Sequence, residues 1–174
     1  MKVLVVYASR LGSTAGIAER IAARLRSHGL DAVVRPADAE AEPGDFHAFV
    51  IGSAVYAGHW LKEASRFVDR HASVLSTHPV WLFSSGPVGE TATHATPVEP
   101  AESGDIRRSI RVVDQRVFAG SLDRRNIEDS DLGFAERFIA KRFVPEGEYR
   151  DWPQIDSWAD GIAAELLATP VGGR

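Results

Sequence analysis

Residues 7–22 read YASRLGSTAGIAERIA and follow the short apolar run at residues 3–6. The run is typical of a buried strand, and Ile17, Ile21 and Leu25 recur at the spacing of one helix face. A turn of small hydroxyl residues around Gly12 joins the two patterns. Such a turn suits a loop whose backbone N–H groups wrap an anion at a helix N-terminus. This strand, loop and helix decide the fold class.

The totals describe an ordinary globular chain. It has 174 residues, a formal net charge of −4, 44% hydrophobic residues and 25% charged residues. We expect a single domain over residues 1–168, with a flexible tail at 169–174. The charge argues against a nucleic-acid partner, which would call for a basic chain. Cysteine is absent, which excludes disulfides and thiolate chemistry and favours a cytoplasmic location.

Apolar strand patterns alternate with helical ones along the chain, an order that predicts a doubly wound α/β sheet of three layers. Five parallel strands in the order 2-1-3-4-5 suit this pattern. The strands are expected at residues 2–7, 31–35, 46–52, 80–84 and 117–122. The helices are expected at residues 13–28, 60–75, 105–114, 131–143 and 155–167.

Three predicted loops meet at the carboxyl ends of the strands, where open α/β sheets bind ligands. They span residues 8–14, 53–59 and 84–89, and all are rich in small, hydroxyl or glycine residues. The first loop matches neither the GxxxxGK[ST] nor the GxGxxG pattern. A mononucleotide phosphate therefore fits it better than a pyrophosphate. The alternative is an ordinary helix start capped by Ser13.

The other two loops favour a planar ring. Tyr56 and Trp60 offer aromatic walls, Gly58 offers a peptide that can rotate, and the loop SSGPVG (84–89) offers backbone amides. The alternatives are aromatic side chains that cap the core and a plain connection after the fourth strand. We interpret His59 as an exposed turn histidine rather than an acid–base group.

The stretch VVYASRLGSTAGIAERIA resembles the phosphate loop of flavodoxins, S/T-x-T-G-x-T. Ser9, Gly12 and Thr14 match this pattern, and Leu11 stands where the family has threonine. Later motifs are similar to the flavodoxin-type, menaquinone-dependent protoporphyrinogen oxidases. That group usually has an arginine and then a tyrosine before its Gly-His pair, where this chain has Tyr56 and Ala57. These later motifs are Gly58-His59-Trp60, Phe118-Ala119-Gly120 and Asp151-Trp152.

The resemblance implies an FMN-binding oxidoreductase of flavodoxin-like fold that serves heme biosynthesis, oxidising protoporphyrinogen with a quinone or a similar small-molecule acceptor. It nominates no catalytic side chain and no metal ligand. The residues that it implies around FMN are Ser9, Arg10, Leu11, Gly12, Ser13 and Thr14 at the phosphate, Ala54, Val55, Tyr56, Ala57 and Gly58 along the ring, and Ser85, Gly86, Pro87 and Gly89 at the pyrimidine edge.

Two alternatives within this fold stay open. One is an electron-transfer flavodoxin without its own substrate, although such chains are usually far more acidic. The other is a deazaflavin-binding protein. Three other protein classes are excluded because residues that they require are missing. A receiver domain needs acidic residues where Ala8, Ser9 and Ser53 stand, and neither the GxSxG elbow of serine hydrolases nor an HExxH metal motif is present.

Six arginines gather between residues 107 and 125, namely Arg107, Arg108, Arg111, Arg116, Arg124 and Arg125. They suit propionate groups of a porphyrinogen, an acidic redox partner or anionic lipid. A solvated charged surface is the alternative. The predicted helix at 131–143 either packs on the core or touches a membrane, so peripheral contact with the inner membrane face is left open. The oligomeric state is also open, a homodimer included.

Overall fold

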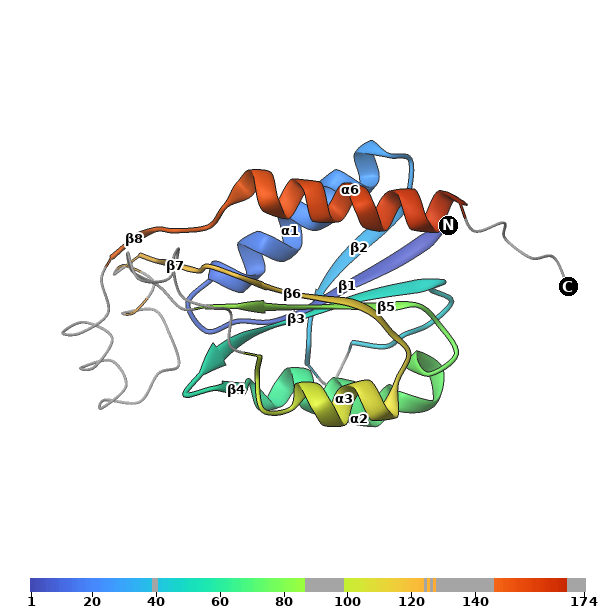
Figure 1. Ribbon diagram of the computed structural model, residues 1–174, viewed down its shortest axis with the longest axis horizontal. Coiled ribbons are helices and arrows are strands. Elements are labelled where there is room, and N and C mark those ends of the chain that lie inside the picture. The colour runs from blue at the N-terminus through green and yellow to red at the C-terminus, as the bar shows by residue number, and fades with distance from the viewer. Residues whose placement is uncertain (39–40, 87–98, 124, 126, 128–145, 169–174) are drawn as a thin grey trace, which may run out of the picture.

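The structure is a computed structural model that describes residues 1–38, 41–86, 99–123, 125, 127 and 146–168. Its main sheet has the parallel order β2-β1-β3-β5-β6 (Figure 1). The two-residue strand β4 (His59–Trp60) pairs with the end of β3, and β7 (Ser121–Leu122) pairs separately with β8 (Gly147–Glu148). The five parallel strands are β1 (Lys2–Ala8), β2 (Asp31–Pro36), β3 (Ala48–Tyr56), β5 (Val80–Ser85) and β6 (Val112–Phe118).

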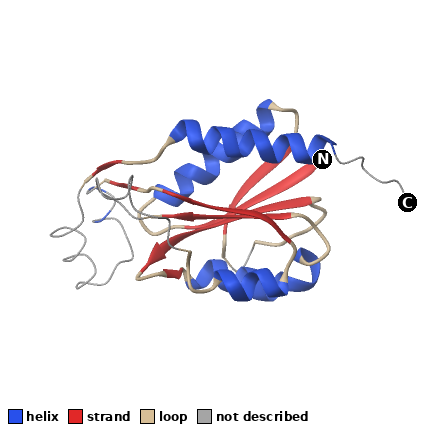
Figure 2. Ribbon diagram, in the orientation of Figure 1, coloured by secondary structure: helices blue, strands red, loops and turns tan. Residues whose placement is uncertain are grey.

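Helices cover both faces of this sheet (Figure 2). Helices α1 (Ser13–Ser27) and α6 (Trp152–Ala168) lie on one face, and α2 (Lys62–Leu75) and α3 (Ser103–Ser109) lie on the other. Burial on both faces explains the nearly continuous apolar runs of the central strands. The predicted three-layer α/β fold and its strand order, 2-1-3-4-5 for the parallel strands, are confirmed.

Alternation along β1 divides the core in two. Val3 and Val5 join the cluster beneath α1 and α6, whereas Leu4 and Val6 join the cluster over α2 and α3. At the middle of the sheet, Gly52 makes room for a ring, because a Cβ placed on it would overlap Cζ of Phe83. No residue larger than glycine fits there without repacking.

An ion-pair ladder joins α1 to α6. The Arg20 guanidinium donates to both carboxylate oxygens of Asp156, at 2.6 Å each, and Arg24 donates to those of Asp160 at 2.7 and 2.8 Å. His28 Nε2 lies 2.7 Å from the same Asp160. These residues recur at four-residue steps on each helix, so one face of α1 faces one face of α6 along several turns.

The last parallel strand lies five residues earlier than predicted. A helix at 105–114 and a strand at 117–122 were expected, but α3 ends at Ser109, Ile110 is extended (φ −135°, ψ 165°), and β6 begins at Val112. The reason is that β6 is an edge strand with half-exposed residues. Polar residues at its centre hide the apolar pattern that marks a buried strand.

The second correction concerns the loop predicted at 53–59. Strand β3 continues to Tyr56, a two-residue turn follows, and β4 includes Trp60, the first residue of the helix predicted at 60–75. Helix α2 begins at Lys62. The predicted helix at 131–143 and the tail at 169–174 lie outside the described residues. Within the described part of the chain, no helix is long and apolar enough to cross a membrane.

Candidate functional site

The first loop turns tightly between β1 and α1. Ser9 Oγ accepts a hydrogen bond from the Gly12 N–H at 3.1 Å, and Gly12 adopts φ 84°, a left-handed conformation suited to glycine. Gly12 is the N-cap of α1 and no side chain caps this end. The interpretation of Ser13 as a helix cap is therefore wrong. An uncapped helix N-terminus behind a glycine turn leaves backbone donors suited to an anion.

Thr14 lies in the first turn of α1 with its side chain 0% exposed. Its Oγ1 has no hydrogen-bond partner in the structure. An unpaired buried hydroxyl costs roughly 1–3 kcal/mol, so a ligand oxygen that accepts from it would recover that cost. This orphaned donor, at an uncapped helix N-terminus, fits a phosphate group.

The Ser13 hydroxyl ties distant segments together. Ser13 Oγ accepts from the Ser121 N–H at 2.9 Å and shares a hydrogen bond with Ser85 Oγ at 3.1 Å. The first loop is thereby joined to the end of β5 and to the start of β7. Sequence patterns carry no signal for this bridge, because 72 and 108 residues separate its partners.

The second loop is a β-hairpin rather than an open loop. Tyr56 pairs with His59 across a two-residue turn in which Ala57 has φ 50° and Gly58 has φ 82°. Two positive φ angles define a type I′ turn. A positive φ at a non-glycine residue such as Ala57 stores strain, which is commonest at functional sites. The Gly58 carbonyl accepts from the Ala101 N–H at 3.0 Å, so rotation of the peptide that follows Gly58 would break this bond.

Serine hydroxyls fix the hairpin to the core. Trp60 Nε1 donates to Ser84 Oγ at 2.9 Å, and the Leu61 N–H donates to Ser53 Oγ at 2.9 Å. The Trp60 side chain is only 5% exposed. The expectation that Trp60 forms a wall for a ring is therefore wrong, and the alternative, an aromatic side chain that caps the core, holds for it.

Glu102 holds the far strand of the hairpin from α3. Its carboxylate accepts from the Trp60 N–H at 3.0 Å and from His59 Nδ1 at 2.8 Å. Burial raises the pKa of Glu102, but the hydrogen bonds from Trp60 and His59 lower it by more, so this pKa lies below its ordinary value. The His59 ring stays largely exposed, with 63% of its side chain accessible.

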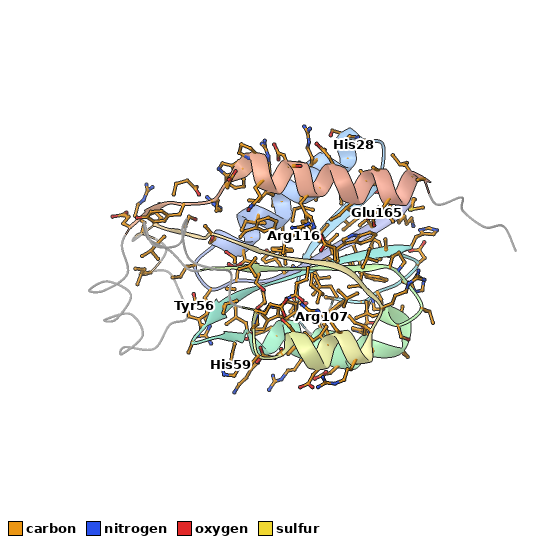
Figure 3. The ribbon with its side chains drawn as sticks, in the orientation of Figure 1. His28, Tyr56, His59, Arg107, Arg116 and Glu165 are labelled. Carbon is orange, nitrogen blue, oxygen red and sulfur yellow. The ribbon has the colours of Figure 1, made fainter. Side chains whose placement is uncertain are left out.

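Tyr56 is a more exposed aromatic side chain of the hairpin than Trp60. Its side chain is 39% exposed, and the Arg10 guanidinium lies over its ring, 5.6 Å from the centroid. Figure 3 places Tyr56 and His59 at the end of the sheet where β3 and β4 meet. Arg10 and Tyr56 thus connect the first two loops.

The third loop approaches the second at Gly86. The Gly86 N–H donates to the Phe118 carbonyl at 3.0 Å, and a Cβ on Gly86 would lie 3.7 Å from the Val55 carbonyl oxygen. Its φ of 131° also favours glycine. These contacts bring residues 9–14, 54–58, Ser85 and Gly86 to one end of the sheet, whereas Pro87 and Gly89 lie outside the described residues. Leu11 is a partial exception, since its side chain packs against Leu122 and Ile127.

Most of the predicted basic cluster is paired with carboxylates. Arg107 Nη2 lies 2.5 Å from Glu99 Oε1, and Arg125 Nη2 lies 2.7 Å from Asp123 Oδ2. Arg116 Nε lies 3.0 Å from Asp114 Oδ2. Arg108 also pairs with Asp105. These pairs reduce the positive potential that a basic face would offer an anionic partner. Arg124 lies outside the described residues.

Two further features concern the rest of the molecule. In the described residues, no cluster of three histidine or acidic side chains could hold a metal ion. A cavity of about 600 Å³ lies between β6 and α6, and no described residue of the three loops is among its lining residues. Trp81, Arg116, Trp158 and Glu165 are among the residues that line it.

Residues 4–149 match the flavodoxin domain family, and the chain belongs to that family. It is also similar to a named enzyme, the protoporphyrinogen IX dehydrogenase [quinone] of Escherichia coli K12. The two sequences are 27% identical over 173 residues, which cover 94% of this chain and 95% of the enzyme.

Solved structures confirm the fold at low identity. An archaeal flavodoxin superposes with a TM-score of 0.62 at 18% identity, covering 96% of this chain and 99% of its own. Oxidised flavodoxin 2 from Bacillus cereus gives a TM-score of 0.62 at 20% identity, and the match covers 95% of this chain and 99% of that flavodoxin. The rubredoxin:oxygen oxidoreductase of Desulfovibrio gigas gives 0.61 at 17% identity, over 98% of this chain but only 37% of that protein.

Proposed function

We propose that the three loops bind FMN and that the protein is an FMN-dependent oxidoreductase. The observation that carries this proposal is the buried, unpartnered hydroxyl of Thr14 beside the uncapped start of α1. A phosphate oxygen would accept from this hydroxyl and from the first amides of the helix. Bound FMN supplies hydride and electron transfer, which no side chain of this protein provides alone.

The remaining residues have assigned parts in this proposal. Ser9 and Gly12 shape the phosphate turn, and Ser13 fixes its distance from the ring-binding loops. The exposed ring of Tyr56 offers a flat apolar wall to the isoalloxazine. Ser85 and Gly86, which lie beside the end of β6, would offer hydrogen-bonding groups to the pyrimidine edge. The hairpin of residues 54–58 would line the ring.

For the substrate we propose protoporphyrinogen, with a quinone as electron acceptor. The support is the similarity to the Escherichia coli dehydrogenase, which spans nearly the whole of both chains. A quinone acceptor would bring the protein to the inner face of the membrane from the cytoplasm, as a peripheral protein.

The experiment is an anaerobic reduction of the FMN-loaded protein, followed by its visible absorption. Protoporphyrinogen should bleach the flavin band at a rate that rises with its concentration, and a menaquinone analogue should restore the band. Free FMN under the same conditions is the control for uncatalysed reduction. The proposed substrate is wrong if protoporphyrinogen bleaches the loaded protein no faster than it bleaches free FMN.

The same experiment distinguishes the two alternatives within the fold, an electron carrier and a deazaflavin-binding protein. A protein that loads FMN and exchanges electrons with a reductase, but not with protoporphyrinogen, is an electron carrier. A protein that ignores FMN and binds a deazaflavin belongs to the other class. Its cofactor has a longer anionic tail, for which Arg10 is the basic residue of the first loop.

A further inference from the structure

Strand β6 is the last strand of the main sheet as far as the described residues extend. It pairs with β5, and no other strand of the described residues pairs with it. Val113 in this strand is 41% exposed, and the side chains of Asp114 and Arg116 are 37% and 57% exposed. An open strand edge of this kind is a template for pairing with another chain.

The backbone of β6 shows which residues offer that edge. The Phe118 carbonyl accepts from the Gly86 N–H on the β5 side. Because backbone groups alternate in direction along a regular strand, those of Asp114 and Arg116 also face β5, and those of Gln115 and Val117 face outward. Val113 lies at a register shift, where Val80 pairs with Val112 and Trp81 with Asp114, so this alternation does not extend to it. The outward donors and acceptors thus lie at Gln115 and Val117.

The sequence around Gln115 is complementary to itself when two copies run antiparallel. Residues 112–118 read VVDQRVF. A two-fold axis through Gln115 sets Asp114 opposite Arg116 of the second copy, twice, and Val113 opposite Val117. The charged pairs would fall at positions without backbone hydrogen bonds, where side chains lie closest and Cα atoms are about 4.5 Å apart.

The neighbouring cavity supports the same partner. Glu99, Asp114 and Glu165 contribute acidic groups to the cavity of about 600 Å³ between β6 and α6. Within one chain Arg116 pairs with Asp114, and in the dimer the second copy's Arg116 would take its place at Asp114. Figure 3 shows the labelled residues Arg116 and Glu165 in the region between β6 and α6.

We propose that two copies of this chain pair through their β6 edges, antiparallel and centred on Gln115, to form one continuous sheet across a homodimer. The partner is a second copy because its own charges and apolar residues fall in register. The pairing needs no cofactor, so its test is independent of the proposed function. The wild-type protein should sediment at twice its chain mass of 18.9 kDa.

Charge reversal tests the register. Arg116→Asp would place an aspartate opposite Asp114 of the other copy at both ends of the pairing. This repulsion should weaken dimerisation about tenfold or more. Adding Asp114→Arg restores opposite charges and should restore the dimer. Arg66→Asp, at an exposed arginine of α2, is the control that should leave the mass unchanged. Far-UV circular dichroism identifies any variant that fails to fold, which matters because Asp114 also accepts from Trp158 Nε1.

A disulfide provides a second test, because the chain has no cysteine of its own. Gln115→Cys places two thiols opposite each other at a Cα separation of about 5.5 Å, within disulfide range. With diamide as oxidant it should form a covalent dimer rapidly. Val113→Cys should not form a covalent dimer, because residue 113 of one copy lies opposite residue 117 of the other and the two thiols are far apart. A wild-type protein that stays at 18.9 kDa at every concentration, or equal cross-linking of the two variants, would overturn the proposal.

Discussion

Thr14 is the residue on which the proposed FMN site depends most. A buried threonine hydroxyl without a partner is uncommon, because burial removes it from water and nothing replaces the lost hydrogen bond. Here it lies beside a helix N-terminus that no side chain caps. Both features are unfavourable by themselves and become favourable once an anion binds.

Thr14→Val should therefore separate binding from stability. Valine keeps the shape and removes the hydroxyl, so the dissociation constant for FMN should rise about 10- to 100-fold. The free energy of unfolding should stay the same or rise by about 1 kcal/mol, since an unpaired polar group is gone. Fluorescence titration and chemical denaturation measure the two quantities.

Thr14→Ser is the matched control, because it keeps the hydroxyl and loses only a methyl group. It should bind FMN within a few-fold of the wild type. Equal FMN affinity of the valine and wild-type proteins would show that the Thr14 hydroxyl makes no contact with the ligand.

Gly52 is the second residue with a sharp expectation. Its missing side chain leaves the space that the Phe83 ring occupies, so a Cβ at this position would overlap the ring. Gly52→Ala should therefore destabilise the protein by about 1–3 kcal/mol through overpacking. Gly161→Ala, in α6 with nothing within 4 Å of its Cβ position, should stabilise it by up to about 1 kcal/mol. Thermal unfolding compares them, and equal effects would contradict the packing described.

At the scale of elements, the α1–α6 ladder makes stability depend on acid. Hydrogen bonds from Arg24, and then from His28, lower the pKa of Asp160 from 3.8 to about 2. A carboxyl whose pKa is lowered in the folded protein stabilises it above the unfolded pKa. That contribution is lost as the pH falls from about 4 to about 2.

Asp160→Asn removes this titration. The variant should be less stable than the wild type at neutral pH, and the difference should vanish as the pH approaches about 2. Asp69→Asn, which removes an exposed carboxylate of α2, is the control for the loss of one surface charge outside the ladder. Thermal unfolding across this range measures the effect. A difference between Asp160→Asn and wild type that does not change with pH would contradict the role of the ladder.

The elements that the sequence predicted well are those buried on both faces. Strands β1 and β5 and helix α1 carry clear apolar patterns and match their predicted bounds within one residue. Strand β3 was also predicted, but it begins two residues later and ends four residues later than expected. Strand β6 was misplaced because an edge strand keeps polar side chains, and α3 was extended over it for the same reason. The hairpin at Ala57 was missed because a type I′ turn usually shows Asn-Gly or Asp-Gly.

At the scale of the whole molecule, strand order alone brings three loops to one edge of the sheet. Residues 9–14, 54–58 and 85–86 could therefore be predicted as neighbours from their places at the carboxyl ends of β1, β3 and β5, which are adjacent in the sheet. The contacts between them could not, because Ser13 with Ser85 and Arg10 with Tyr56 join residues far apart in the chain. The burial of Trp60 depended on Ser84 in the same way.

The proposed site requires that the first loop bind the phosphate of a flavin mononucleotide. Calorimetric titration of the wild-type protein with FMN and, separately, with riboflavin tests this requirement, because the two ligands differ only in that phosphate. FMN should bind at least about 100-fold more tightly, the sum of several charge-assisted hydrogen bonds. Equal affinities, or no binding of either ligand, would show that the first loop is not a flavin phosphate site.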